Sequence, residues 1–159
     1  MINNIETYLT YENIYLLANW GILPFWLLLL ISPNNNLTKF LVHSIITPLL
    51  LGVAYIYVAY KIYLDGNILE SFNLYFGLEN LYSLYSNEAF LLIFWLHFLC
   101  ISLFIGSWIA RDAQRYMVPR FLMILSLIIT YFAGPVGFIF YWFIRIFFQK
   151  KLDLMIKSF

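Results

Sequence analysis

Four long stretches without a charged residue constrain this chain more than any other feature. The first runs from residue 13 to residue 38, where no Asp, Glu, Lys or Arg interrupts it. The hydrocarbon core of a bilayer is about 30 Å thick, and an α-helix crosses it in about 20 apolar residues. The sequence therefore predicts an all-α integral membrane protein with four transmembrane helices. The expected spans are residues 14–32, 40–64, 89–110 and 119–148.

The composition excludes a soluble domain. Apolar residues make up 64% of the 159 residues and charged residues only 11%, whereas soluble domains are about half apolar and about a quarter charged. The sequence also lacks a glycine-rich phosphate loop, a cysteine pair with zinc spacing and a serine nucleophile elbow. We therefore expect no metal, no cofactor and no nucleic-acid partner, and we look for function among polar residues of the spans.

The segments outside the spans differ in charge and in apolar content. Residues 1–13 form an acidic N-terminal segment without the basic start of a signal peptide. Residues 65–88 are too apolar for a free linker, and their spacing favours a short amphipathic helix in the membrane interface, with an irregular aromatic loop as the alternative. Residues 149–159 form a basic tail.

The last apolar stretch allows two topologies because Gly134-Pro135-Val136-Gly137 interrupts it. As one helix, residues 121–148 would be about 42 Å long, and a Gly-Pro break inside a kinked span is tolerated in lipid. If the chain turns back at this motif, eight of its nine basic residues share one side, as the positive-inside rule favours. Each half would then have only about 13 residues, which is short of a span. The last span is thus either kinked or re-entrant.

Ionisable and polar side chains inside the spans are candidates for function because burying them in lipid is costly. On the third span, residues three and four apart share one helix face with His97; they are Phe94, Ile101, Phe104, Trp108 and Arg111. A histidine there can transfer a proton or serve as a packing contact between helices, and the same alternatives apply to His43. Haem ligation by the two histidines is disfavoured, because their expected depths differ by more than about 10 Å.

Several motifs occur in a fixed order along the chain. They are Trp20-x-x-Leu23-Pro24-x-Trp26, Pro33, Thr38, Trp95-Leu96-His97-Phe98-Leu99, Leu103-Phe104-Ile105-Gly106, Trp108-Ile109-x-x-Asp112, Gly134-Pro135-x-Gly137 and Tyr141-x-x-x-Arg145. This pattern resembles the neoxanthin synthase-like family of small membrane proteins, the abscisic-acid-deficient type, with its bacterial relatives. The resemblance implies a four-span protein and, from the plant members, a cofactor-independent carotenoid isomerase that converts violaxanthin to neoxanthin. One departure is Ser102, where the family is expected to have an aspartate.

By motif, the resemblance implies catalytic roles for His97 and Asp112. The expected ligand-binding residues are Trp95, Phe104, Trp108, Trp20, Trp26 and Arg111. The function expected from the resemblance is to bind or isomerise a carotenoid or another isoprenoid lipid within the bilayer. The alternative is a non-catalytic subunit or assembly factor, so the expected partners are membrane lipid or carotenoid, a second copy of the chain, or a larger membrane complex. The expected location is a bacterial inner membrane, with an organelle membrane as the alternative.

Overall fold

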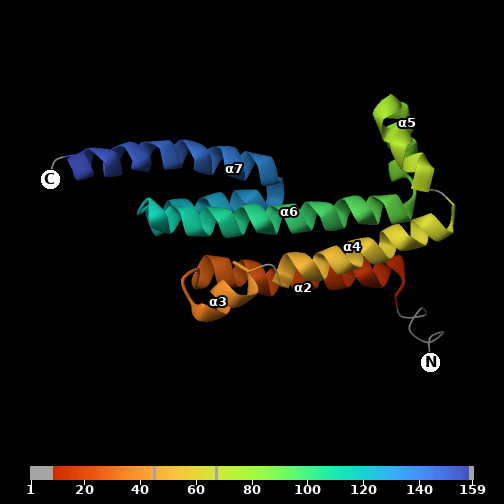
Figure 1. Ribbon diagram of the computed structural model, residues 1–159, viewed down its shortest axis with the longest axis horizontal. Helices are drawn as coiled ribbons and strands as arrows, with labels where there is room; N and C mark the ends of the chain where they lie inside the picture. The colour runs from red at the N-terminus through yellow and green to blue at the C-terminus, as the bar shows by residue number, and fades with distance from the viewer. Residues whose placement is uncertain (1–8, 45, 67, 158–159) are drawn as a thin grey trace. The chain divides into compact units, whose positions relative to one another are not determined.

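The computed structural model describes residues 9–44, 46–66 and 68–157, with side chains described for all of these except 68–71 and 151–157 (Figure 1). The elements are α2 (Tyr11–Ile31), α3 (Asn36–Leu41), α4 (Ile46–Leu64), η1 (Ile68–Phe76), α5 (Leu78–Tyr85), α6 (Glu88–Arg115) and α7 (Arg120–Lys157). Element η1 is a 3₁₀ helix. Within the described ranges no strand occurs, which confirms the all-α prediction.

Four helical stretches of the described chain are long and apolar enough to cross a membrane, in agreement with the four that the sequence predicts. They are residues 11–31, 36–64, 88–115 and 120–150. The segment expected at the interface, residues 65–88, contains η1 and α5.

The chain packs as two compact units. Unit 1 comprises Met1–Leu23 and Pro48–Cys100, and unit 2 comprises Pro24–Thr47 and Ile101–Phe159. In the sequence, eight of the nine basic residues belong to unit 2, and the ninth, Lys61, belongs to unit 1. Six of the eight acidic residues belong to unit 1. The two units therefore carry charges of opposite sign.

The second expected span, residues 40–64, is not one continuous helix. Helix α3 ends at Leu41 and α4 begins at Ile46. The Ser44 hydroxyl accepts a hydrogen bond from the Ile46 amide at 3.2 Å, which satisfies a free donor at the start of α4. Thr47 donates to the Leu41 carbonyl at 2.7 Å, and Pro48 lies in the first turn of α4, where a backbone N–H is not needed. Within the second expected span, these local caps therefore start a new helix.

Helix α7 is a hairpin of two helical arms. Ala133 (φ −139°, ψ 44°) and Gly134 (φ 3°, ψ −77°) have non-helical backbone angles. In a straight helix, Arg145 would lie about 38 Å from Arg120, but its Nε atom lies 2.8 Å from Oδ2 of Asp112, near the end of α6. The second arm therefore runs back along the first, as Figure 1 shows within unit 2. Of the two topologies the sequence allows, the turn-back agrees with these contacts.

Small side chains let the two arms of α7 approach closely. A Cβ atom built on Gly137 of the second arm would lie 2.3 Å from the Thr130 amide nitrogen of the first arm. Thr130 and Ser126 are fully buried, and each donates its hydroxyl to a carbonyl one turn earlier, at 2.7 and 2.8 Å. The hairpin therefore packs backbone against backbone, as helices with small residues do in membranes.

Because α7 turns back, we expect three segments of unit 2 to be exposed on the same side of the membrane. Single cysteines placed by Lys39→Cys, Met117→Cys and Lys150→Cys, in a Cys100→Ser background, should all react with an impermeant thiol reagent from the same side. The basic residues of unit 2 predict that this side is the cytoplasm, so we expect labelling in inverted vesicles and none in intact cells. Labelling of Lys150→Cys from the opposite side to Met117→Cys would contradict the turn-back.

Candidate functional site

An aromatic groove of about 440 Å³ lies in unit 1, between α4, η1, α5 and α6. Its aromatic and ionisable lining consists of Tyr55, Tyr75, Tyr85, Phe90, Phe94 and His97. The rest of its described lining is aliphatic, and no carboxylate, lysine or arginine is part of it. His97 is thus the one imidazole among the described lining residues.

Helical spacing on α6 directs the groove residues to one side. Phe90, Phe94 and His97 are four and three residues apart, so they share a face. The Tyr85 ring of α5 packs edge-on against Phe94, with ring centroids 5.1 Å apart. The His97 side chain is exposed, and it makes no hydrogen bond to any residue that the structure describes. Both imidazole nitrogens are therefore available to a ligand.

A second polar group lies in unit 2, at Asp112. Its Oδ2 atom accepts hydrogen bonds from the Tyr141 hydroxyl and from Arg145 Nε, each at 2.8 Å. Arg145 Nη2 donates to the Tyr116 hydroxyl at 3.1 Å, and the guanidinium lies 4.7 Å from the centroid of that ring. Trp108 packs edge-on against Tyr141 at 5.6 Å. These contacts join the end of α6 to the second arm of α7.

The contacts of Asp112 differ from those the sequence suggests. Arg115, three residues later on α6, is the local partner expected for a carboxylate at this position. The structure pairs Asp112 with Arg145 instead, because the turn at Gly134 returns the second arm of α7 to the end of α6. Sequence reasoning misses this ion pair and the Tyr141 bond, although the Tyr141-x-x-x-Arg145 motif places both side chains on one helix face.

The structure does not bring His97 and Asp112 together. Both lie on α6, where 15 residues separate them along the chain and correspond to about 22 Å of helix rise. His97 belongs to unit 1 and Asp112 to unit 2. We therefore treat them as parts of two separate candidate sites.

The expected ligand-binding residues of unit 1 have different surroundings. Trp95 donates from Nε1 to the Asn19 side chain at 3.0 Å and stacks on Phe98 with centroids 5.5 Å apart. Trp20 is 71% exposed. Trp95 therefore holds α2 to α6 within unit 1, whereas Trp20 presents its ring to the surroundings.

The expected ligand-binding residues of unit 2 differ in exposure. Trp26 is 3% exposed, and a Cβ atom on Gly106 would lie 2.8 Å from its ring. Phe104 and Arg111 are exposed, and Trp108 packs on Phe138 and Tyr141. Trp26 and Trp108 are packing residues of unit 2, whereas Phe104 and Arg111 are accessible.

His43 makes two hydrogen bonds within unit 2. Its Nε2 atom lies 3.1 Å from the Pro33 carbonyl oxygen, and its Nδ1 atom lies 2.8 Å from Oγ of Ser107. Because a carbonyl only accepts, Nε2 carries a proton, and in the neutral ring Nδ1 accepts from the Ser107 hydroxyl. These bonds join the connection after α2 to α6, which agrees with the packing interpretation of His43.

Comparison with known proteins identifies the family. The family described as ABA DEFICIENT 4-like matches residues 13–141, which is most of the chain. The chain is 24% identical over 110 residues to "Protein ABA DEFICIENT 4, chloroplastic" of Arabidopsis thaliana, covering 67% of this chain. It spans about half the length, 50%, of that relative. No solved structure matches the chain. The long family match shows that this chain belongs to the ABA DEFICIENT 4-like family.

Proposed function

We propose that this protein binds a carotenoid or a related isoprenoid lipid within the bilayer and isomerises it in the aromatic groove of unit 1. The observation that carries the proposal is the groove itself, an apolar and aromatic space whose described lining has one imidazole and no fixed charge. Aromatic rings favour a polyene or a terminal ring of an isoprenoid, because both bury apolar surface against flat faces. The family relation supports the same ligand class.

The chemistry that suits this groove is a proton relocation. In the conversion of an epoxide to an allenic alcohol, a carbon next to the ring loses a proton, the C–O bond breaks, and the oxygen gains a proton. The product is an isomer of the substrate, so the step needs no oxidant or reductant. The His97 imidazole can take the proton from carbon, while a phenol of the groove, such as that of Tyr85, can give one to oxygen.

Asp112 has a different role in this proposal. Its carboxylate is already bound by Tyr141 and Arg145, and 15 residues of α6 separate it from His97. We assign it to holding the hairpin of α7, outside the reacting groove. Ser102, where an aspartate is expected in the family, is 3% exposed, belongs to unit 2 and does not line the groove. The proposed reaction therefore does not require an aspartate at this position.

Binding is tested by the absorption spectrum of the protein, purified gently from a carotenoid-producing host. We expect a structured visible polyene spectrum at near-stoichiometric level, and chromatography of the extract should show an isomer that differs from the membrane pool. A spectrum with only the aromatic band near 280 nm would contradict the proposal and favour the alternative of a non-catalytic subunit.

Catalysis is tested by His97→Ala in a host that supplies an epoxidised carotenoid. Loss of a general base lowers turnover by about 10²–10⁴-fold, and we expect the isomerised product to fall by at least about 100-fold. The exposed His97 side chain makes no hydrogen bond to described residues, so protein level and stability should not change. Product formation equal to that of the wild type would remove His97 from the mechanism.

A pair of tyrosine variants tests whether a hydroxyl of the groove contributes to turnover. Tyr85→Phe keeps the ring that packs on Phe94 but removes a groove hydroxyl, and it should lower turnover. Tyr82→Phe makes the same chemical change at a side chain that is 77% exposed and does not line the groove, and it should have no effect. Equal turnover in the two variants would exclude the Tyr85 hydroxyl as the acid.

A further inference from the structure

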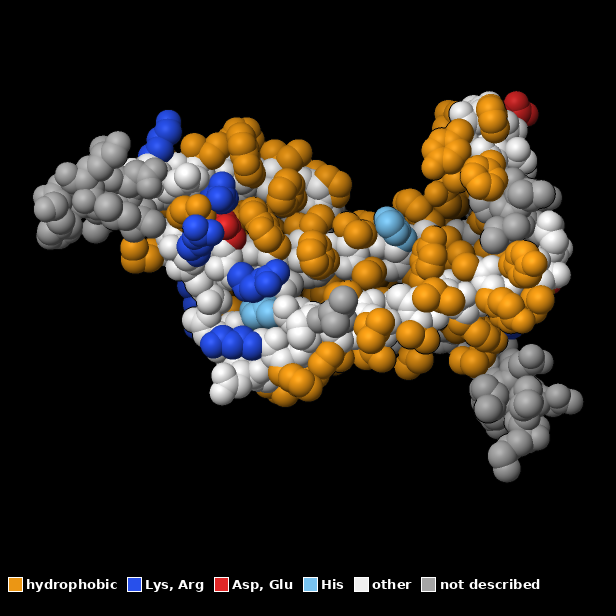
Figure 2. Space-filling view, in the orientation of Figure 1, with side chains coloured by type: hydrophobic (Ala, Val, Ile, Leu, Met, Phe, Trp, Pro, Cys, Tyr) orange, Lys and Arg blue, Asp and Glu red, His pale blue; other side chains and the backbone are white. Residues whose placement is uncertain are grey.

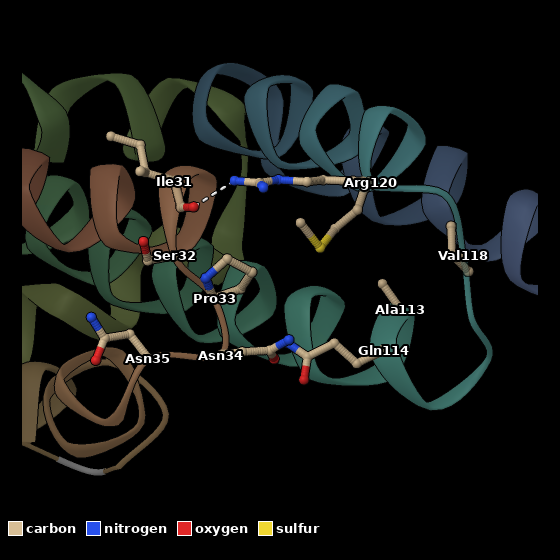
Figure 3. A pocket seen from close by; sticks show the side chains of 10 residues that line it. Ile31, Ser32, Pro33, Asn34, Asn35, Ala113, Gln114, Val118 and Arg120 are labelled. Carbon is tan, nitrogen blue, oxygen red and sulfur yellow. Dashed lines mark hydrogen bonds between the residues drawn. The ribbon is translucent and has the colours of Figure 1, made fainter.

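Unit 2 contains a second pocket, of about 530 Å³, whose lining differs from that of the groove (Figure 3). It lies between the end of α2 with the turn that follows it, the end of α6 and the start of α7. Its polar lining consists of Ser32, Asn34, Asn35, Gln114 and Arg120, and no described lining residue is a carboxylate. The other half of the lining is apolar.

The polar groups of this pocket have hydrogen-bonding capacity that the described protein does not use. Arg120 Nη2 donates to the carbonyl oxygens of Ile31 and Leu30 at the end of α2. Its Nε and Nη1 atoms make no hydrogen bond to any residue that the structure describes. The carboxamides of Asn34 and Gln114, which point toward each other across one edge in Figure 3, are also unbonded within the described ranges.

We propose that this pocket binds the phosphate group of an anionic membrane lipid. A guanidinium offers paired N–H donors that match phosphate oxygens, and amide N–H groups complete the shell around such an anion. Unit 2 carries eight basic residues against two acidic ones, so an anion is attracted rather than repelled. The Ile31 and Met123 side chains of the same pocket offer apolar surface to the glycerol and the first methylenes of the lipid.

The position of the pocket along the helices supports a head group. Its lining lies at Ile31, the last residue of α2, at Gln114 near the end of α6 and at Arg120, the first residue of α7. Ends of membrane-spanning helices lie at the depth of lipid phosphates, and basic pockets between such helices bind anionic head groups. Figure 2 shows Lys and Arg side chains gathered over α3 and the neighbouring ends of α6 and α7 in unit 2.

The test measures lipid binding to the full chain in a neutral detergent by native mass spectrometry. Phosphatidylglycerol and phosphatidylcholine are added separately. Both carry a phosphodiester, but the quaternary ammonium of phosphatidylcholine cancels its net charge and is repelled by the basic residues of unit 2, so we expect bound phosphatidylglycerol to exceed phosphatidylcholine by about tenfold. Arg120→Gln should remove most of this preference. Arg115→Gln removes the same charge from an exposed site that does not line the pocket, and it should keep the preference.

A second variant covers the case in which Arg120→Gln does not fold, since Arg120 also bonds the end of α2. Gln114→Leu fills the pocket edge with an apolar side chain and should lower phosphatidylglycerol binding at unchanged stability. An excess of inorganic phosphate distinguishes the sources of the anion: unchanged lipid binding supports a head-group site, whereas displacement supports a phosphate site that takes the free ion. Equal binding of the two lipids, or equal loss in Arg115→Gln and Gln114→Leu, would overturn the proposal.

Discussion

Gly137→Ala should destabilise the α7 hairpin by about 3 kcal/mol or more, at the upper end of the range for overpacking. The added Cβ atom would lie 2.3 Å from both the amide nitrogen and Oγ1 of Thr130, and 2.5 Å from its Cα. Backbone atoms cannot rotate away, and the Thr130 hydroxyl is held by its bond to Ser126. The two arms must therefore move apart. The loss is measured as the free energy of unfolding in mixed detergent micelles.

Three other glycines provide matched controls for this prediction. A Cβ atom on Gly21 or Gly52 meets no atom within 4 Å, so alanine there should be neutral or stabilise the helix by up to about 1 kcal/mol. Gly106→Ala should have an intermediate effect, because its Cβ atom would meet the buried Trp26 ring, a side chain that can shift, at 2.8 Å. If Gly137→Ala and Gly52→Ala have the same free energy of unfolding, the close approach of the two arms is contradicted.

The long helices of this chain are predictable from the sequence because the length of each apolar stretch is a local property. Each of the four expected spans contains about enough apolar residues to cross a bilayer, and four such helical stretches are present, of which the fourth reverses at Gly134. The division between α3 and α4 is less predictable. It depends on the hydroxyls of Ser44 and Thr47, which cap a new helix inside a stretch that is apolar enough to continue.

The turn-back of α7 is only partly predictable from the sequence. The Gly134-Pro135 motif permits either a kink or a reversal, and local geometry does not choose between them. The distribution of Lys and Arg favours reversal, and the contacts of Arg145 agree with it. The partner of Asp112 could not be chosen from sequence, since Arg115 satisfies the helical spacing and Arg145 becomes available only after the chain reverses.

The sequence predicts single residues of the candidate site, but it does not predict which of them lie together. Helical spacing places His97 on an aromatic face of α6, and Phe94 of that face lines the groove. The tyrosines of the groove come from α4, η1 and α5, and only tertiary packing assembles them. The resemblance likewise implies catalytic roles for both His97 and Asp112, but a motif order carries no distance, and 15 residues of one continuous helix separate them.

Asp112→Leu should cost about 3 kcal/mol of stability, because it leaves the Arg145 guanidinium without its anion in a mostly buried place. The Asp112 and Arg145 side chains are only 10% and 24% exposed, and the fully buried Tyr141 hydroxyl loses its acceptor as well. Arg145→Met should have a similar cost, since it leaves the carboxylate unpaired. The double variant should be more stable than the sum of the two losses predicts, because both charges are then gone.

The same unfolding measurement in detergent micelles completes this double-mutant cycle. Glu79→Gln, at an exposed residue of α5, removes a carboxylate without a buried partner and should change stability by no more than about 0.5 kcal/mol. A coupling energy near zero between Asp112→Leu and Arg145→Met would show that the ion pair does not hold the hairpin. A large coupling would show that the Asp112–Arg145 ion pair stabilises the hairpin. If carotenoid turnover is lost in His97→Ala but kept in the double variant, the ion pair acts on stability and the aromatic groove acts on the reaction.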